Sequence, residues 1–241
     1  MQKSKVLTVF VLICYFLFAF FEFSGNDLLS YFSNCLMVPL ITLIYFFSVK
    51  KKNTWFLMFL LCYALADIIG LCIIKITAYN SELWSDFNYY IGNTLYILSY
   101  VFLIINIGHS LSFKYVFEHF RMHLLVLIGL IIYLVYFLHE VINPNLILES
   151  DYYLELVYNL VVFSLLAISL LNYFYKDNKK SLYLFLGALC IVFSEVIDTA
   201  YIYVDQRSIL IFLSTTLTLV GFYFFYQQAK LLNISPREKR Y

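Results

Sequence analysis

Three carboxylic acids lie within long apolar runs of the chain, where acids are rare. Asp67 is in "CYALADIIG" (62–70), and Glu195 and Asp198 are in "CIVFSEVIDTA" (190–200). An acid in a membrane-spanning helix costs about 2.5–3.5 kcal/mol on insertion scales, so such residues generally have partners or a function. Carboxyls crowded together without a cation share protons, so that one remains protonated while another is ionised. A protonated acid beside an ionised base is the pair that hydrolysis requires.

Neutral polar residues are the expected surroundings of these acids, because no lysine, arginine or histidine lies at their depth in an apolar run. The polar residues at a similar depth are Asn34, Asn93, Tyr96, Tyr100, Asn159, Thr215, Thr216 and Thr218. Glu195 and Asp198 are three residues apart and therefore share one helix face. We expect Asp67 and Glu195 to be the catalytic pair in one polar pocket. The residues expected to surround that pair or to contact a substrate are Asn34, Asn93, Tyr96, Tyr100, Ser194 and Asp198.

A structural role is the alternative for each acid. An uncharged carboxyl that is hydrogen-bonded to asparagine or tyrosine can simply stabilise a helix bundle. Asp198 fits this alternative best, because its counterpart in the internal repeat described below is Gly70.

The elements that position these acids are membrane-spanning helices. The chain has 241 residues, of which 63% are hydrophobic and only 13% are charged, whereas a soluble domain carries about 25% charged residues. A helix needs roughly 20 apolar residues to cross the hydrocarbon core. Eight such runs cover residues 6–23, 28–49, 54–74, 88–109, 122–139, 153–175, 181–203 and 208–232. The sequence therefore predicts an all-α membrane protein with eight transmembrane helices in a single polytopic domain, residues 1–241.

The basic residues predict the orientation of these helices. With eight spans, one side of the membrane receives Lys3, Lys5, Lys50, Lys51, Lys52, Lys114, Arg121, Lys176, Lys179, Lys180, Lys230, Arg237, Lys239 and Arg240. The opposite side receives only Lys75 and Arg207. Because lysine and arginine mark cytoplasmic loops, we expect both termini in the cytoplasm. The first run ends in "FAFFEFSG", which lacks the small residues of a cleavage site, so we expect it to be retained as a span.

The remaining composition limits the classes of site and partner. The five cysteines lie in apolar runs without a C-x-x-C pair, which argues against a disulfide framework and against a zinc site. We expect no cofactor, no bound metal and no nucleic-acid partner. A membrane lipid or lysolipid is the expected substrate.

An internal repeat relates the two halves of the chain, about 1–115 and 116–241. The segment "KKNTWFLMFLLCYALADIIG" (51–70) aligns without a gap with "KKSLYLFLGALCIVFSEVID" (179–198), which places Asp67 on Glu195. Each acid follows the last lysine of its loop by 15 residues, or about 22 Å of helix, and therefore lies in the outer half of the membrane. We expect two parallel four-helix repeats, related by an axis along the membrane normal. Chance similarity between two apolar helices is the alternative.

The sequence resembles the YhhN-like lysoplasmalogenases, an eight-helix membrane family. The third helix has Ala66 and Asp67, similar to the family's Gly-Asp, and the seventh has "GALCIVFSE" (187–195), similar to its G-A-L-L-F-x-x-S-D. The eighth has "YFFYQ" (223–227), similar to Y-Y-x-x-Q. Two further segments align with family motifs but differ from them at some positions. Gly92, Tyr96 and Tyr100 align with G-x-x-x-F-x-x-x-H, and "VPL" (38–40) aligns with K-P-L. Glu195 stands where the family has Asp, Val38 where it has Lys, and Tyr100 where it has His.

The resemblance implies hydrolysis of the vinyl ether bond of lysoplasmalogens, with the paired acids on the third and seventh helices. It is consistent with a location in a bacterial inner membrane. Two other functions remain open from the residues alone. A small cation-coupled or proton-coupled carrier would use the acids to bind its ion and would have broken helices at the site. An accessory membrane subunit would use them for packing.

Overall fold

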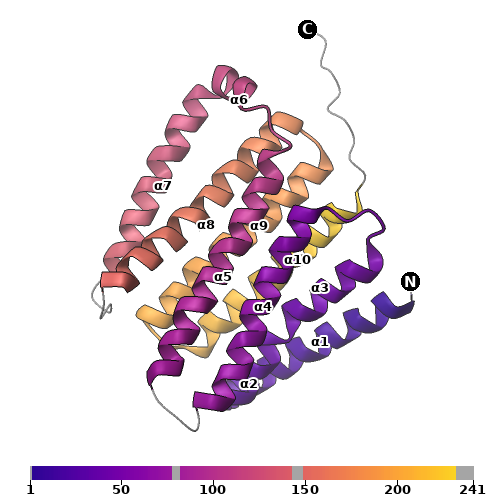
Figure 1. Cartoon of the computed structure of the whole chain (residues 1–241), viewed down its shortest axis with the longest axis vertical. Coiled ribbons are helices and arrows are strands. Elements are labelled where there is room, and N and C mark those ends of the chain that lie inside the picture. The colour runs from indigo at the N-terminus through magenta and orange to yellow at the C-terminus, as the bar shows by residue number, and fades with distance from the viewer. Residues whose placement is uncertain (1, 78–81, 143–148, 232–241) are drawn as a thin grey trace.

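The computed structural model describes residues 2–77, 82–142 and 149–231, and these residues fold almost entirely into helices (Figure 1). The helices are α1 (Gln2–Phe23), α2 (Asp27–Cys35), α3 (Met37–Ser48), α4 (Thr54–Thr77), α5 (Glu82–Gly108), α6 (Phe113–His119), α7 (Arg121–Ile142), α8 (Glu149–Lys176), α9 (Lys179–Tyr203) and α10 (Ser208–Lys230). No strand occurs in the described residues.

Eight helical segments of the described chain are long and apolar enough to cross a membrane, with α2 and α3 counted as one segment. The predicted fold class, an all-α membrane protein, is therefore confirmed. Three helices begin at least four residues before the predicted apolar runs: α1 at Gln2, α5 at Glu82 and α8 at Glu149. The extra residues at their starts include polar ones. The short helix α6 was not predicted and occupies the loop between α5 and α7.

The second span is interrupted at Leu36, where α2 ends and α3 begins. Pro39 is the third residue of α3. Its ring lacks the N–H of an ordinary helical residue and clashes with the carbonyl four residues earlier, that of Cys35. The sequence predicts one continuous helix over 28–49. That prediction is wrong at Leu36, and Pro39 is the physical cause of the interruption.

Local signals fix the ends of the helices that carry the acids. At the start of α9, Asn178 accepts a hydrogen bond from the backbone N–H of Ser181 at 2.9 Å, while the Ser181 hydroxyl accepts from the Asn178 N–H. At the start of α4, the Asn53 side chain accepts from the backbone N–H of Trp55 at 2.9 Å. These caps satisfy orphan N–H groups, and they set where each helix begins relative to its acid.

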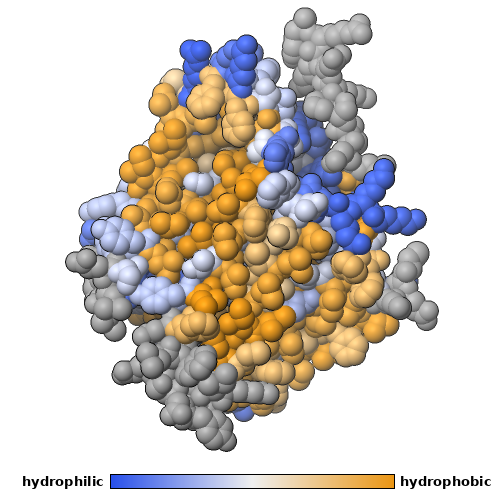
Figure 2. Space-filling view, in the orientation of Figure 1, coloured by the Kyte–Doolittle hydropathy of each residue, from blue (hydrophilic) through white to orange (hydrophobic). Residues whose placement is uncertain are grey.

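The two ends of the bundle differ in charge. The basic end, where α3, α5, α8 and α10 end, carries the lysine-rich loops. The acidic end, where α1, α4, α7 and α9 end, carries residues such as Asp27, Asp151 and Asp205. Between the ends, hydrophobic side chains cover most of the visible face, as expected of a surface in contact with lipid (Figure 2).

The packing of neighbouring helices follows the same order in both halves of the chain. The pairs α4–α5 and α9–α10 pack most extensively, α3 packs on α4 as α8 packs on α9, and between the halves α5 packs on α8 as α10 packs on α3. Two halves related by an axis along the membrane normal would have these neighbours. The relation of the halves to one another stays a prediction.

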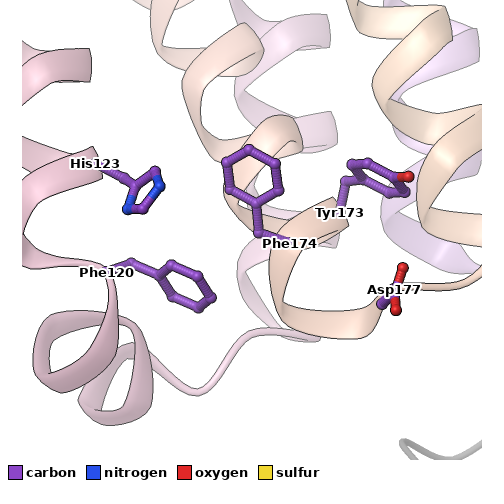
Figure 3. A pocket seen from close by; sticks show the side chains of 5 residues that line it. All are labelled: Phe120, His123, Tyr173, Phe174 and Asp177. Carbon is purple, nitrogen blue, oxygen red and sulfur yellow. The ribbon is translucent and has the colours of Figure 1, made fainter.

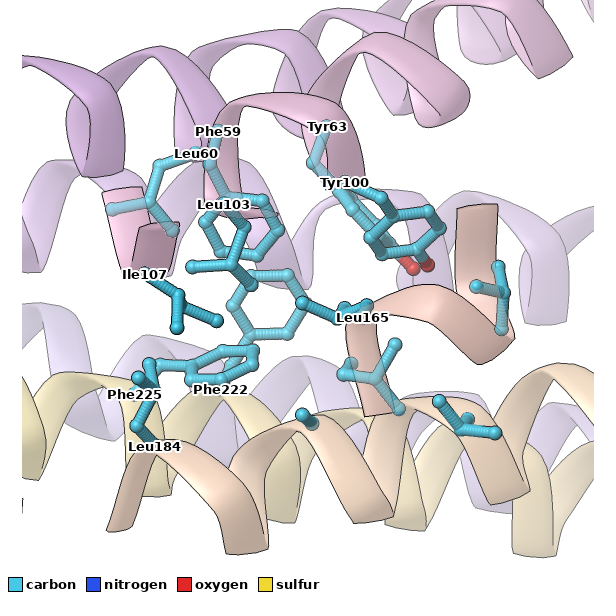
Figure 4. Packing of buried hydrophobic residues seen from close by; sticks show 14 of the residues in the cluster. Phe59, Leu60, Tyr63, Tyr100, Leu103, Ile107, Leu165, Leu184, Phe222 and Phe225 are labelled. Atoms are coloured by element: carbon cyan, nitrogen blue, oxygen red, sulfur yellow. The ribbon is translucent and has the colours of Figure 1, made fainter. Parts of the chain in front are cut away.

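The hydrophobic core lies between α4, α5, α8, α9 and α10. Figure 4 shows Phe59 of α4, Leu103 of α5 and the Phe222 and Phe225 rings of α10 gathered in this core. Phe59 stacks on Phe222, with ring centroids 5.7 Å apart. This core borders the tyrosines that reach the acids, because Tyr63 and Tyr100 belong to the same cluster.

Candidate acid–base site

Helix α5 brings two tyrosines to the two predicted catalytic acids. The Tyr96 hydroxyl donates to Oδ1 of Asp67 on α4 at 2.6 Å, and the Tyr100 hydroxyl donates to Oε1 of Glu195 on α9. Tyr96 and Tyr100 are four residues apart, so they lie on one face of α5 about 6 Å apart along its axis. The structure therefore holds the two carboxyls, Asp67 from α4 and Glu195 from α9, beside adjacent turns of α5.

Glu195 has a second tyrosine donor, from α8. The Tyr158 hydroxyl donates to Oε2 of Glu195 at 2.7 Å, so each carboxylate oxygen accepts one phenolic hydrogen bond. Three helices, α5, α8 and α9, therefore meet at this one carboxyl group.

Tyr63 of α4 packs between the two donors from α5. Its ring lies edge-to-face against Tyr96 and Tyr100, with centroids 4.8 Å and 6.1 Å away. Figure 4 shows the hydroxyls of Tyr63 and Tyr100 pointing the same way and lying close together. Since Tyr63 is one helical turn before Asp67, it joins the surroundings of both acids.

The Asp67 side of the site is buried, Glu195 is half-buried, and hydroxyl groups rather than lysine or arginine bind the two carboxyls. Asp67 is 7% exposed and Tyr100 is fully buried. In the loop between α9 and α10, Arg207 forms an ion pair with Asp205. Hydroxyl groups therefore take the place that a cation would have beside Asp67 and Glu195.

Helix α2 also lies close to Asp67. Tyr31 and Cys35 lie close enough to Asp67 to interact with its charge. Asn34, which the sequence places beside the acids, is half-buried next to Cys35 at the end of α2. The interruption of the second span at Leu36 therefore lies close to this acid.

Ser194 and Asp198 face a different neighbour from Glu195. The Ser194 hydroxyl hydrogen-bonds with the backbone oxygen of Ser214 and with the Thr218 hydroxyl, at 2.9 Å and 2.6 Å. Asp198 accepts from the Ser214 hydroxyl at 3.3 Å. Both predicted site residues thus join α9 to α10, whereas Glu195 is bound from α5 and α8.

Two asparagines named from the sequence take different positions. Asn93 is half-buried on α5, three residues before Tyr96. Asn159 on α8 is 4% exposed, and its Nδ2 has no hydrogen-bond partner among the described residues. The donor from α8 is instead its neighbour Tyr158, which sequence reasoning missed. The chain has 23 tyrosines, so residue type alone does not single out Tyr158. Only the rotation of α8 about its axis shows that this tyrosine faces Glu195.

The described residues contain no group of three or more histidine, cysteine, aspartate or glutamate side chains that could hold a metal ion. A surface pocket of about 420 Å³ lies at the basic end, near the start of α7 (Figure 3). Its lining residues are Phe120, His123, Tyr173, Phe174 and Asp177. None of the predicted site residues lines this pocket.

The arrangement can move protons between carboxyl and phenol groups inside an apolar bundle, which is the chemistry of a general acid paired with a general base. Comparison of the chain with protein-family models, with curated proteins and with solved structures found no match.

Proposed function

We propose that the chain is a membrane-embedded hydrolase that cleaves the vinyl ether bond of lysoplasmalogen-like lipids. One observation carries the proposal. Asp67 of α4 and Glu195 of α9 lie beside adjacent turns of α5, and each accepts a hydrogen bond from a tyrosine hydroxyl of that helix. Asp67 is buried and Glu195 is half-buried, and two such carboxyls without a paired cation can divide the roles of acid and base between them. The sequence resemblance to YhhN-like lysoplasmalogenases involves the same two helices and suggests which bond is cleaved.

The number of hydroxyl donors suggests which acid has which role. Glu195 accepts from two tyrosines, Tyr100 and Tyr158, whereas Asp67 accepts from Tyr96. Hydroxyl groups that donate to a carboxylate stabilise its negative charge. Glu195 is therefore the proposed ionised base, and Asp67 is the proposed protonated acid.

The reaction begins when Asp67 donates its proton to the vinyl carbon remote from the ether oxygen. The electron pair of the double bond forms the new C–H bond, and positive charge spreads over the other vinyl carbon and the oxygen. The Glu195 carboxylate stabilises that charge. Water then adds to the charged carbon and gives a proton to Glu195. The resulting hemiacetal collapses to a fatty aldehyde and a glycerophospholipid with a free hydroxyl.

The proposed location follows from the charge difference between the two ends of the bundle. The basic end, where α1 begins and α10 ends, faces the cytoplasm, so the acids lie in the outer half of the membrane, the inner membrane of a bacterium. A lysolipid can reach them from the surrounding bilayer, and the proposed chemistry uses no metal or cofactor.

The experiment is an assay of aldehyde release by purified protein in lipid nanodiscs supplied with a lysoplasmalogen. Asp67→Asn and Glu195→Gln preserve side-chain volume, and each is expected to reduce turnover by about 100-fold or more. The matched control is Glu22→Gln, because Glu22 is also a buried acid with a hydroxyl donor, Ser30 at 2.6 Å, but lies on α1. Wild-type protein that releases no aldehyde would refute the hydrolase proposal.

A proton-coupled carrier is the second candidate, and the interruption of the second span beside Asp67 favours it. Broken helices at the ion site are common in carriers. Proton flux into liposomes separates the two functions, because a carrier would couple flux to a solute and lose that coupling in Asp67→Asn. If both variants lose only stability, the acids serve packing, as in an accessory subunit.

A further inference from the structure

We infer that Glu155 is a proton-relay residue that connects Glu195 with the aqueous phase at the acidic end of the bundle. It acts through Glu195 and does not contact the substrate. The inference deepens the proposed function and rests on the role of Glu195 as the base. Each proposed turnover leaves a proton on Glu195 and none on Asp67. Before the next turnover Glu195 must release one proton, which is the step assigned to Glu155, and Asp67 must take one up.

One face of α8 carries the row of groups that leads to Glu195. Asp151, Glu155 and Tyr158 are spaced at i, i+4 and i+7, so they follow one another along that face. The row starts in the first turn of α8 and ends at the hydroxyl that donates to Glu195. From Asp151 to Tyr158 it covers about 10 Å along the helix axis.

Tyrosines from neighbouring helices bind each carboxyl of this row. The Tyr90 hydroxyl of α5 donates to Asp151. Glu155 accepts from Tyr89 of α5 at 2.8 Å and from Tyr203 of α9 at 3.2 Å. Glu155 is thus a carboxyl bound by tyrosines from two helices. The same pattern occurs at Glu195, which lies deeper in the bundle.

The carboxyls of the row are also close to one another. Glu155 interacts electrostatically with Asp151 toward the acidic end and with Glu195 toward the centre. The titratable groups that face Glu155 are Asp151 on α8, Tyr89 on α5, Tyr203 and Glu195 on α9, and His139 on α7. No lysine or arginine is among these described neighbours, so no fixed positive charge holds Glu155 in its ionised form.

Such a row can pass a proton in either direction. A phenol and a protonated carboxyl each have one O–H donor and free acceptor positions, so a proton that enters at one group can leave at the next. Chains of acids inside membrane proteins commonly serve as proton relays. Asp151 is half-exposed at the acidic end, which gives the row contact with water.

The experiment measures how fast Glu195 takes up a proton in nanodiscs after a rapid drop in pH. The signal is the infrared band of the protonated Glu195 carboxyl, which is identified because it is missing from the spectrum of the Glu195→Gln variant. Glu155→Gln keeps the volume and the acceptor oxygen of the side chain but cannot carry the proton, and it is expected to slow protonation by about 100-fold. Glu155→Asp should restore most of the rate, and Glu22→Gln should leave it unchanged.

The same variants in the aldehyde assay should show a lower kcat for Glu155→Gln with little change in KM. If Glu155→Gln does not fold, the double variant Tyr89→Phe and Tyr203→Phe tests the same step and should also slow protonation. Protonation as fast as in the wild type in either variant would overturn the relay. Wild-type protein that cleaves no vinyl ether would refute the hydrolase alone, because the infrared measurement does not depend on turnover.

Discussion

At the scale of single residues, the phenolic hydroxyl is the group that makes acids tolerable within the helices of this bundle. Asp67, Glu195 and Glu155 each accept from at least one tyrosine. A cation would hold a carboxyl permanently ionised, whereas a phenol stabilises the charged form and still allows the carboxyl to be protonated. The site can therefore change its charge during a reaction.

Removal of one donor from Glu195 tests this role of tyrosine. Tyr158→Phe deletes a hydrogen bond to a charged group, worth about 1.5–3 kcal/mol, so we expect turnover to fall roughly tenfold to 100-fold. The control is Tyr183→Phe, whose ring stacks on Phe224 near the basic end. Equal loss of aldehyde release in both variants would contradict a specific contribution from Tyr158.

At the scale of helices, the close contact between α9 and α10 sets the position of Glu195. Gly187 allows this approach: a Cβ at this position would lie 2.5 Å from the Phe225 ring and 3.1 Å from the backbone oxygen of Gly221. Any larger residue at 187 would therefore push α9 away from α10, and with it Glu195, one of the two proposed catalytic acids.

Gly187→Ala is expected to destabilise the folded protein by about 1–3 kcal/mol, the usual range for overpacking. The matched control is Gly129→Ala on α7, because a Cβ there meets no atom within 4 Å and alanine favours a helix. Thermal unfolding in detergent measures both variants. An unchanged Tm for Gly187→Ala would show that α9 and α10 can separate without cost.

The spans could be predicted from the sequence because length and apolar composition alone determine them. Asp67, Glu195, Tyr96 and Tyr100 could be chosen because depth in the membrane follows from counting residues. Tyr158 and Glu155 could not, since their importance depends on the rotation of α8 about its axis. The sequence does not reveal that rotation, because the lipid-facing and core-facing surfaces of a membrane helix are both apolar and differ little in hydrophobicity.

The interruption at Leu36 shows a second limit of sequence reasoning. Pro39 signals a disturbance in the second span, but a proline also occurs within the first turn of many regular helices. The structure places the interruption three residues before the proline, near Asp67.

At the scale of the whole molecule, the charge difference between the two ends predicts a single orientation in the membrane. In a variant without native cysteines, a cysteine at Asp205 should react with a membrane-impermeant maleimide added outside intact cells. A cysteine at Lys51 should react only after the cells are opened. A reporter fused after Tyr241, which lies outside the described residues, should be cytoplasmic. The reverse labelling pattern would place the acids in the inner half.

The measurement that tests the central claim most directly is hydrolysis of a lysoplasmalogen in D₂O, with the aldehyde analysed by mass spectrometry. If Asp67 protonates the vinyl carbon, the wild-type protein should release an aldehyde with one deuterium on the carbon next to the carbonyl. Asp67→Asn should release almost none, while Glu22→Gln should match the wild type. The absence of aldehyde from the wild type, or deuterated aldehyde at an equal rate from Asp67→Asn, would contradict the claim.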